Sequence, residues 1–315
     1  MTVIFEKGSE LILDDVFLAL PDLAPGREVL LKIECMNPAG SIKMKTALAL
    51  IEDVEAAGAL GPGKRVIESS SGNLGIALAA VCTERGYDLT IVTDPNATSD
   101  AVAMMRAFGA DVRTVTVTDA NGGYLGSRLE YIRAALAADP ALVWPNQYAN
   151  PANARAHERT TAPAILKELG HLDALFVGVG TAGTLRGCLD HLRAMNARTR
   201  VFAVDTVGSV TFGGEARPRF VPGIGSSRRP ELFEDTGDFD KVLVHERDAV
   251  RECRLMARRH GLLVGGSTGS VLAAARRLCG GLAEGARCVV ISPDSGAKYL
   301  KSVFSDPWVA ERHLG

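Results

Sequence analysis

The chain has 315 residues, of which 47% are hydrophobic and 23% are charged, and its formal net charge is −2. This length accommodates two domains of ordinary size, and the apolar content can fill a large core. The near-neutral charge gives no reason to expect nucleic acid or an anionic membrane surface as a partner. No apolar stretch reaches the length of a membrane span and the first residues do not resemble a secretory signal, so a cytoplasmic protein is expected.

Six cysteines and six histidines are spread along the chain. No two cysteines form a C-x-x-C pair, and no histidines are spaced as zinc ligands on a helix. We therefore expect free thiols in a reducing compartment and no metal site.

Short β-branched segments alternate with longer amphipathic segments along the chain. The predicted strands are residues 28–33, 65–68, 89–92, 111–115, 175–179, 200–204 and 287–291. The predicted helices are residues 43–55, 75–83, 99–108, 126–138, 153–168, 184–195, 246–260, 270–278 and 297–304. This alternation predicts right-handed βαβ crossovers and an α/β protein with mostly parallel sheets.

The turn after the first predicted strand carries a lysine at a helix start. Pro38 and Gly40 make the turn, and Ser41 is expected to cap the helix. Lys43 then lies at the positive end of the helix dipole, where a cation is disfavoured. Such an amine loses its proton more easily, which suits a nucleophilic or Schiff-base lysine. The alternative is an ordinary surface lysine in the first helical turn.

Three further strand-to-helix turns are rich in small and polar residues. Residues 68–75 place Ser70, Ser71, Gly72 and Asn73 at a helix start, where backbone N–H groups can bind a carboxylate.

The turn at residues 178–184 combines glycines with two threonines and suits a phosphate. It also matches the dinucleotide-binding pattern, but only Asp205 stands near the place where that pattern requires an acid. The turn at residues 293–296 places the Ser295 hydroxyl where it could meet a ring nitrogen. Any one of these turns could be simple helix capping.

Two segments lack a regular pattern. Residues 139–153 are expected to cross between two sheets, and residues 207–230 contain many glycines with Arg217, Arg219, Arg228 and Arg229. A long irregular loop with several arginines favours a lid or an anion-recognition loop, with a solvated insertion as the alternative.

Taken together and in this order, the motifs resemble those of the fold-type II pyridoxal-phosphate enzymes, in the cysteine synthase and cystathionine β-synthase branch. The resemblance runs from about residue 11 to about residue 304. It is carried by residues 37–43, 70–75, 146–153 with His157, 180–184, 223–225 and 293–296.

The resemblance implies a tryptophan synthase β-like fold of two three-layer α/β/α domains with mostly parallel sheets. Residues 37–148 would form a small mobile domain that binds the substrate carboxylate, and residues 1–36 with 149–315 a larger domain that binds pyridoxal 5'-phosphate. A homodimer acting on small amino-acid substrates is usual in this family.

The resemblance also implies a role for each motif residue. Lys43 would hold the cofactor as an aldimine and act as the catalytic base, Asn73 would bind the phenolic oxygen of the cofactor, and Ser295 would face its pyridine nitrogen. The phosphate would lie in the turn formed by Gly180, Thr181, Ala182, Gly183 and Thr184. The substrate α-carboxylate would bind to Ser70, Ser71, Gly72 and Gln147, with Tyr148 facing the substrate.

Several positions depart from the cysteine synthase pattern. Met44-Lys45 follow the lysine, Tyr148 replaces a common phenylalanine, and Ala182 stands where glycine is usual. Residues 204–213 and 221–227 depart further, and together with residues 40–46 and 68–75 they look like the N-(2-amino-2-carboxyethyl)-L-glutamate synthases. Those enzymes make the precursor of L-2,3-diaminopropionate for siderophores and peptide antibiotics.

That resemblance implies a β-replacement reaction. O-phospho-L-serine would lose phosphate to leave an α-aminoacrylate, and the amine of L-glutamate would add to Cβ. The four arginines of residues 207–230 are candidates for binding the acceptor, because arginine pairs bidentately with carboxylates.

Four alternatives remain from the sequence. They are a cysteine synthase that uses O-acetylserine or O-phosphoserine with sulfide, a deaminating dehydratase, a non-catalytic binding protein with this fold, and a nicotinamide dehydrogenase.

Overall fold

The computed structural model describes residues 4–120 and 122–315, and the chain divides into two compact units. Unit 1 comprises Met1–Leu13 and Met36–Asn153, and unit 2 comprises Asp14–Cys35 and Ala154–Gly315. Each unit contains its own sheet, as the strand and helix alternation predicts for an α/β protein. The expected roles of the two domains, and the mobility of residues 37–148, stay predictions.

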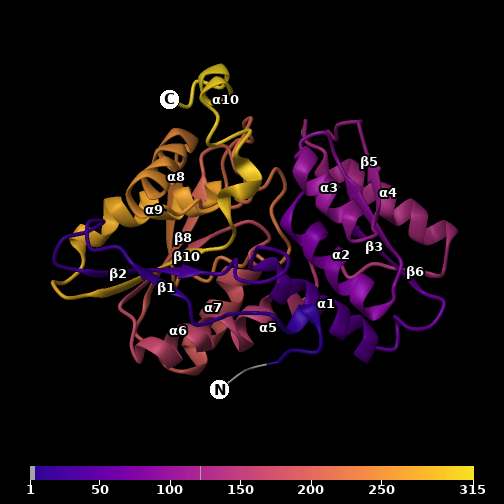
Figure 1. The fold of residues 1–315 in the computed structure, drawn as a ribbon, viewed down its shortest axis with the longest axis horizontal. Coiled ribbons are helices and arrows are strands. Elements are labelled where there is room, and N and C mark those ends of the chain that lie inside the picture. The colour runs from indigo at the N-terminus through magenta and orange to yellow at the C-terminus, as the bar shows by residue number, and fades with distance from the viewer. Residues whose placement is uncertain (1–3, 121) are drawn as a thin grey trace. The chain divides into compact units, whose positions relative to one another are not determined.

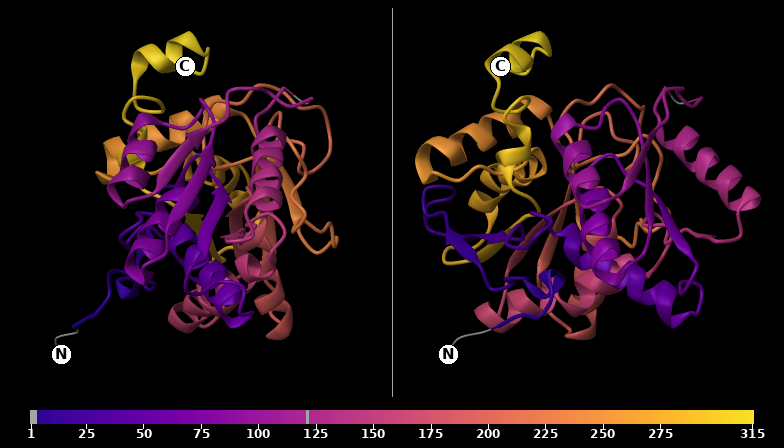
Figure 2. Two further views of the ribbon diagram at one scale, coloured as in Figure 1. Left: turned by 90° about the vertical axis from the view of Figure 1, so that its right-hand side faces the viewer. Right: turned by 45° about the vertical axis from the view of Figure 1, so that its right-hand side comes forward.

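Unit 1 is built on a parallel four-stranded sheet with the order β5-β4-β3-β6. Its strands are β3 (Arg65–Ser69), β4 (Leu89–Thr93), β5 (Asp111–Thr114) and β6 (Leu142–Val143). Its helices are α1 (Lys43–Ala56), α2 (Asn73–Arg85), α3 (Ser99–Ala107) and α4 (Leu125–Ala138), after a short 3₁₀ turn at Gly8–Glu10. Strands β3, β4 and β5, drawn in purple, can be followed in Figure 2.

The two faces of β3 bury different helices. Val66 belongs to the apolar cluster that contains Leu50 of α1 and Leu78 of α2. Its neighbour Ile67 packs instead with Ile132 of α4. Because successive side chains of a strand point to opposite faces, α4 covers the face opposite to α1 and α2.

Unit 2 contains a six-stranded sheet with the order β1-β2-β10-β7-β8-β9, in which only β1 runs antiparallel to its neighbour. Its strands are β1 (Phe17–Ala19), β2 (Glu28–Ile33), β7 (Ala174–Gly178), β8 (Arg200–Thr206), β9 (Asp240–Val244) and β10 (Arg287–Ser292). Its helices are α6 (Thr161–Leu169), α7 (Gly183–Ala194), α8 (Glu246–His260), α9 (Gly266–Leu278) and α10 (Asp306–Glu311), and α5 (Ala152–Arg159) begins at the unit boundary. Figure 1 shows α8 and α9 on one side of this sheet and α6 and α7 on the other.

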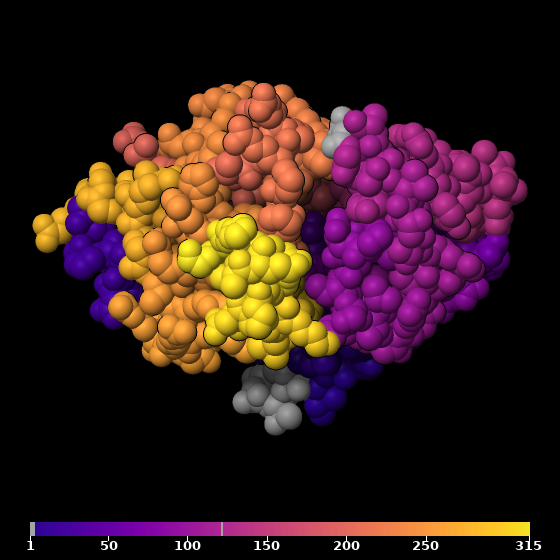
Figure 3. Space-filling view, turned by 90° about the horizontal axis from the view of Figure 1, so that it is seen from above, coloured from indigo at the N-terminus to yellow at the C-terminus, as the bar shows by residue number. Residues whose placement is uncertain are grey.

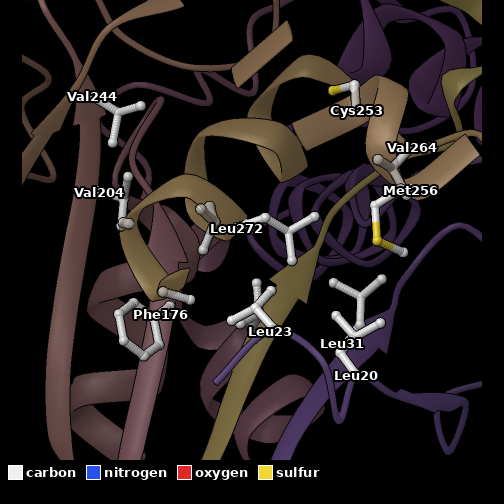
Figure 4. Close-up of a cluster of buried hydrophobic side chains, with 14 of the residues drawn as sticks. Leu20, Leu23, Leu31, Phe176, Val204, Val244, Cys253, Met256, Val264 and Leu272 are labelled. Atoms are coloured by element: carbon white, nitrogen blue, oxygen red, sulfur yellow. The ribbon is translucent and has the colours of Figure 1, made fainter. Parts of the chain in front are cut away.

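The core of unit 2 lies between the sheet and α8 and α9. Leu272 of α9 and Met256 of α8 pack with Leu31 and Val204 from the strands, and Figure 4 shows these side chains in one cluster. Phe176 of β7 stacks on Phe202 of β8 with 4.5 Å between the ring centroids. Fully buried apolar side chains of this size each contribute about 1.5–3 kcal/mol, so this cluster holds the sheet that carries the turns of unit 2.

Gly187 allows α5 and α7 to pack closely. A Cβ atom at this position would lie 2.2 Å from the carbonyl oxygen of Ala154 and 2.7 Å from the amide nitrogen of Glu158. Both contacts are with backbone, which cannot move aside as a flexible side chain can. The close packing therefore requires glycine here.

The predicted helix over residues 153–168 is wrong as a single element, because the structure contains α5 and α6 with a break at Thr160. The reason is Pro163, whose ring in a continuous helix would clash with the carbonyl of Arg159, four residues earlier. Helix α5 ends at Arg159, and Thr160 takes a φ of −126° while its hydroxyl donates to the Ala156 carbonyl oxygen.

The predicted helix over residues 297–304 is also wrong. Only a short 3₁₀ turn, Gly296–Tyr299, forms there, and turns follow it. The Tyr299 hydroxyl donates to buried Asp294, which holds the side chain inward and stops the segment from continuing as a regular helix.

Three strands were not predicted. β1 and β6 are only 3 and 2 residues long, and β9 is an edge strand whose side chains alternate between exposed and buried. Edge strands are often short and polar on one face, so they lack the continuous apolar pattern of central strands.

The C-terminal segment packs along the surface of unit 2. In Figure 3 the yellow C-terminal segment covers part of the orange surface, and Arg254 of α8 donates to the carbonyl oxygen of Val303. Among the residues that the structure describes, no helix has the length and apolar composition needed to cross a bilayer.

Candidate active site

The side chain of Asn37 closes the turn that leads to Lys43. Its Nδ2 donates to the carbonyl oxygen of Ser41 (3.0 Å), and the Ser41 amide donates back to Asn37 Oδ1 (3.3 Å). Gly40 takes a φ of +62°, which glycine adopts without strain. The expected N-cap is wrong: Ile42 is the N-cap residue, and Ser41 is buried inside the turn. Lys43 is the first residue of α1, as the sequence predicts.

The amine of Lys43 has an altered acidity. The side chain is half-buried, and burial lowers its pKa to about 8, although the nearby Glu68 carboxylate acts in the opposite direction. Burial disfavours the charged ammonium, so the neutral amine is populated near physiological pH. A neutral amine is what a nucleophile or a base requires.

Glu68 lies at the end of β3 and is fully buried. Its carboxylate accepts hydrogen bonds from the Ser69 amide (2.8 Å), the Trp144 indole (2.9 Å) and the Gln147 amide (3.2 Å). Burial raises its pKa to about 7, while these three hydrogen bonds favour the charged form. Sequence reasoning did not assign this residue a role.

The predicted carboxylate-binding residues of unit 1 meet at the carboxyl end of β3. Ser70 Oγ accepts from the amides of Gly75 (2.9 Å) and Gly72 (3.3 Å), and so shapes the turn that begins α2 at Asn73.

From the other segment, Gln147 Nε2 donates to the Ser69 carbonyl oxygen (2.8 Å), and the Tyr148 hydroxyl lies 3.5 Å from the same oxygen. The turn at residues 70–73 and the pair Gln147 and Tyr148 are therefore neighbours, although 73 residues lie between Asn73 and Gln147 in the sequence.

Arg128 is a buried cation that the sequence analysis did not identify. It is 7% exposed, and its Nε lies 3.3 Å from Asp94 Oδ2. Within the part of the chain that the structure describes, its Nε and Nη1 make no hydrogen bond. Arg128 also opposes the rise that burial causes in the pKa of Tyr148, so it lies near the predicted substrate residues. The available signal was its place on the apolar face of α4, three residues after Leu125 and four before Ile132.

In unit 2, the predicted phosphate turn connects β7 to α7. The strand ends at Gly178 and the helix begins at Gly183, with Ala182 as its N-cap residue. Alanine has no side-chain acceptor, so the first N–H groups of α7 need another partner, which an anion can supply. Thr184 Oγ1 lies 3.2 Å from Nε2 of buried His157, which holds the first turn of the helix against α5.

The turn that contains Ser295 follows β10, the strand next to β7 in the sheet. Because both strands are parallel, their carboxyl ends lie at the same edge, and so do the turns that follow them. Ser295 is half-buried and caps a short 3₁₀ turn by accepting from the Ala297 amide. The neighbouring Asp294 instead lies against Tyr299 and Lys298 inside the fold.

The four arginines of residues 207–230 have different surroundings. Arg217, Arg228 and Arg229 are exposed, and Arg229 stacks on Phe233. Arg219 is half-buried; burial lowers its pKa, and the Asp205 and Glu246 carboxylates oppose that change.

Within the described residues, no group of three or more His, Cys, Asp and Glu side chains could hold a metal ion, and all six cysteines are free thiols. Unit 1 instead offers a half-buried amine and the N-terminus of α2, whose N-cap residue makes no side-chain cap. Unit 2 by itself offers the N-terminus of α7, which also lacks a side-chain cap from its N-cap residue. An aldehyde group suits the amine of unit 1, and a phosphate suits the helix N-terminus of unit 2.

The chain belongs to the pyridoxal-phosphate dependent enzyme family, whose model matches residues 16–294. It is therefore a pyridoxal 5'-phosphate enzyme with the fold-type II architecture that the motifs predict.

Two characterised relatives share one function name, N-(2-amino-2-carboxyethyl)-L-glutamate synthase. The one from Ralstonia nicotianae is 44% identical over 284 residues, which is 90% of this chain and 84% of the relative. The one from Cupriavidus metallidurans is 40% identical over 288 residues, with the same coverage of 90% and 84%. Among solved structures, O-ureido-L-serine synthase matches with a TM-score of 0.88 at 31% identity, covering 98% of this chain and all of that chain. The resemblance found in the sequence motifs is thus confirmed.

The pKa of Lys43 predicts how the apoprotein takes up its cofactor. The rate at which added pyridoxal 5'-phosphate gives a visible absorbance band should rise with pH and level off near pH 8, because the neutral amine attacks the aldehyde and the pKa of Lys43 is about 8. An ordinary lysine would keep the rate rising to about pH 10. Lys43→Ala, which should give no such band, is the control, and a rate still rising at pH 10 would contradict the assignment.

The backbone conformation of Ala182 predicts that substitution by glycine does not lower the free energy of unfolding. Its φ of +67° is costly for a residue with a Cβ atom, by roughly 1–2 kcal/mol, although glycine loses more entropy on folding. Ala182→Gly should leave the free energy of unfolding unchanged or raise it by up to about 1 kcal/mol, as measured by urea denaturation. Ala194→Gly, in the last turn of the same helix, should lower it by about 1 kcal/mol. Equal losses at both positions would contradict this reading of the turn.

Proposed function

We propose that this enzyme catalyses a β-replacement in which O-phospho-L-serine and L-glutamate give N-[(2S)-2-amino-2-carboxyethyl]-L-glutamate and phosphate. The observation that carries the proposal is a half-buried Lys43 of lowered pKa at the start of α1, in a chain 44% identical to a relative that bears this function name. The product would serve L-2,3-diaminopropionate formation for a siderophore or peptide antibiotic.

The chemistry divides between the cofactor and the protein. Pyridoxal 5'-phosphate, when bound, withdraws electrons from the Cα atom of an amino acid attached to it. The neutral Nζ of Lys43 takes the Cα proton of the donor, and the bond between Cβ and the phosphate oxygen breaks with its electron pair leaving on phosphate. The glutamate nitrogen then forms a bond to Cβ and loses a proton, and Lys43 returns a proton to Cα.

The remaining residues bind and orient. In unit 1, Ser70, Ser71, Gly72 and Gln147 bind the donor carboxylate, Tyr148 faces the substrate, and Asn73 binds the phenolic oxygen of the cofactor. In unit 2, residues 180–184 bind the cofactor phosphate, and Ser295 faces the pyridine nitrogen. Support comes from the meeting of the first group at the carboxyl end of β3 and from the adjacency of β7 and β10 for the second.

We further propose that residues 37–148 form the mobile domain that carries the donor carboxylate, and that the enzyme is a cytoplasmic homodimer. These points rest on the resemblance of the sequence motifs to those of the family.

Product analysis tests the acceptor. Purified holoenzyme with O-phosphoserine and glutamate should release phosphate and form an adduct that mass spectrometry identifies as the glutamate product. Parallel reactions contain sulfide in place of glutamate, or no acceptor. Brisk cysteine formation without a glutamate adduct would show a cysteine synthase, and pyruvate without an acceptor would show a dehydratase.

Arg128 is the cation of unit 1 best placed to bind the donor's phosphate, because it is buried near Tyr148 and its Nε and Nη1 make no hydrogen bond within the described residues. A charged hydrogen bond of about 1.5–3 kcal/mol corresponds to roughly 10–100-fold in binding. Arg128→Gln should therefore raise the KM for O-phosphoserine by at least about tenfold.

The donor O-acetylserine separates this role from a structural one, because it lacks the phosphate charge. Its KM should change little in Arg128→Gln, and Arg133→Gln, an exposed position on the same helix, should change neither KM. An equal rise in KM for both donors would show that Arg128 does not bind the phosphate, and would give it a structural role or a role in another step.

A further inference from the structure

The carboxylate of Glu68 joins the end of β3 to residues 144–148, which follow β6 and lie beyond the paired part of the two strands. The β3–β6 ladder contains only the pairs Arg65–Leu142 and Val66–Val143. Beyond it, the chain from Trp144 to Tyr148 runs beside the end of β3 without strand pairing. Glu68 Oε1 accepts from the Ser69 amide and the Trp144 indole, and Oε2 accepts from the Gln147 amide.

The neighbours that bond to this carboxylate are donors. They include two backbone amides and one indole N–H at 2.8–3.2 Å, and the backbone of Asn146 also favours its charged form. An ionised carboxylate only accepts, so it satisfies all three, whereas a neutral amide in its place would turn its own N–H group toward at least one of them. Leaving a buried donor unsatisfied costs about 1–3 kcal/mol.

The segments that Glu68 joins carry the proposed donor-binding groups. Ser70 follows Ser69 directly, and the Gln147 side chain returns to the Ser69 carbonyl oxygen at 2.8 Å. Glu68 therefore holds the backbone at Ser69 and at Gln147, and these two positions determine where the turn at residues 70–72 and the Gln147 amide lie.

The Glu68 carboxylate also acts electrostatically on a cation of unit 1. A buried carboxylate is costly unless it is paired and hydrogen-bonded. Lys43 is the cation that this carboxylate influences, since Glu68 opposes the lowering of the Lys43 pKa by burial. Glu68 therefore affects both the position of the proposed substrate-binding groups and the pKa of the Lys43 amine.

We propose that Glu68 is a positioning residue for the donor amino acid: its carboxylate holds the turn at residues 70–72 and the side chain of Gln147 together, so that they bind the α-carboxylate as one site. The proposal deepens the function proposed above, because it rests on the donor carboxylate binding at this turn. It does not depend on which acceptor or leaving group the enzyme uses.

The test separates substrate binding from turnover. In Glu68→Gln holoenzyme, the KM for O-phosphoserine should rise by at least about tenfold, while kcat should fall by less than about threefold. The dissociation constant of L-alanine, which has the carboxylate but no leaving group, should rise by the same factor, as read from the change in the visible absorbance of the cofactor. Because this readout needs no acceptor, it stands even if the enzyme uses sulfide and the proposed function fails.

Two further variants distinguish positioning from folding. Trp144→Phe removes one of the three donors and leaves the carboxylate. It should therefore also raise the dissociation constant of L-alanine, by a smaller factor than Glu68→Gln does. Glu68→Asp keeps the charge and should recover part of the binding lost in Glu68→Gln. If Glu68→Gln does not fold, the dissociation constant of L-alanine in Trp144→Phe, compared with that of the unaltered enzyme, tests the proposal. Alanine binding unchanged in the folded variants, with only a lower melting temperature, would overturn the proposal.

Discussion

Parallel pairing brings the carboxyl ends of neighbouring strands to one edge of a sheet, and each group of proposed functional residues depends on that constraint. In unit 1 the turn after β3 meets the segment after β6, and in unit 2 the turns after β7 and β10 lie side by side. The turns after β3 and β7 lead into α2 and α7, whose N-cap residues make no side-chain cap. The positive end of a helix dipole favours anions, so these two turns suit negatively charged groups. The 3₁₀ turn after β10 differs, because Ser295 accepts from its Ala297 amide.

Burial then sets the acid–base properties of unit 1. It lowers the pKa of Lys43 to about 8 and raises that of Glu68 to about 7, because water is withdrawn from both charges. The two values lie close to each other and to physiological pH, which is where proton transfer is most effective. The Glu68 carboxylate opposes the lowering of the Lys43 pKa, so it favours the charged form of a lysine that burial and the helix dipole both disfavour.

Local patterns predicted the central strands well and the surroundings of the site poorly. Strand β2 and helix α8 have the predicted bounds, because an apolar run and an amphipathic period are properties of neighbouring residues. Edge strands such as β9, and the break before Pro163, depend on which face is covered and on a steric clash one turn away. Ser41 has a typical capping side chain, but tertiary packing buries it and starts the helix after Ile42.

The sequence by itself determined the α/β class, the order of the motifs and, through them, the family and its cofactor, because these depend on residue types at fixed places along the chain. Only the tertiary structure decided what surrounds them. It placed Gln147 and Tyr148 against Ser69, buried Arg128 beside Asp94, and made Glu68 the common acceptor of three donors. Such contacts join residues far apart in the sequence, and their strength comes from burial, which no local pattern records.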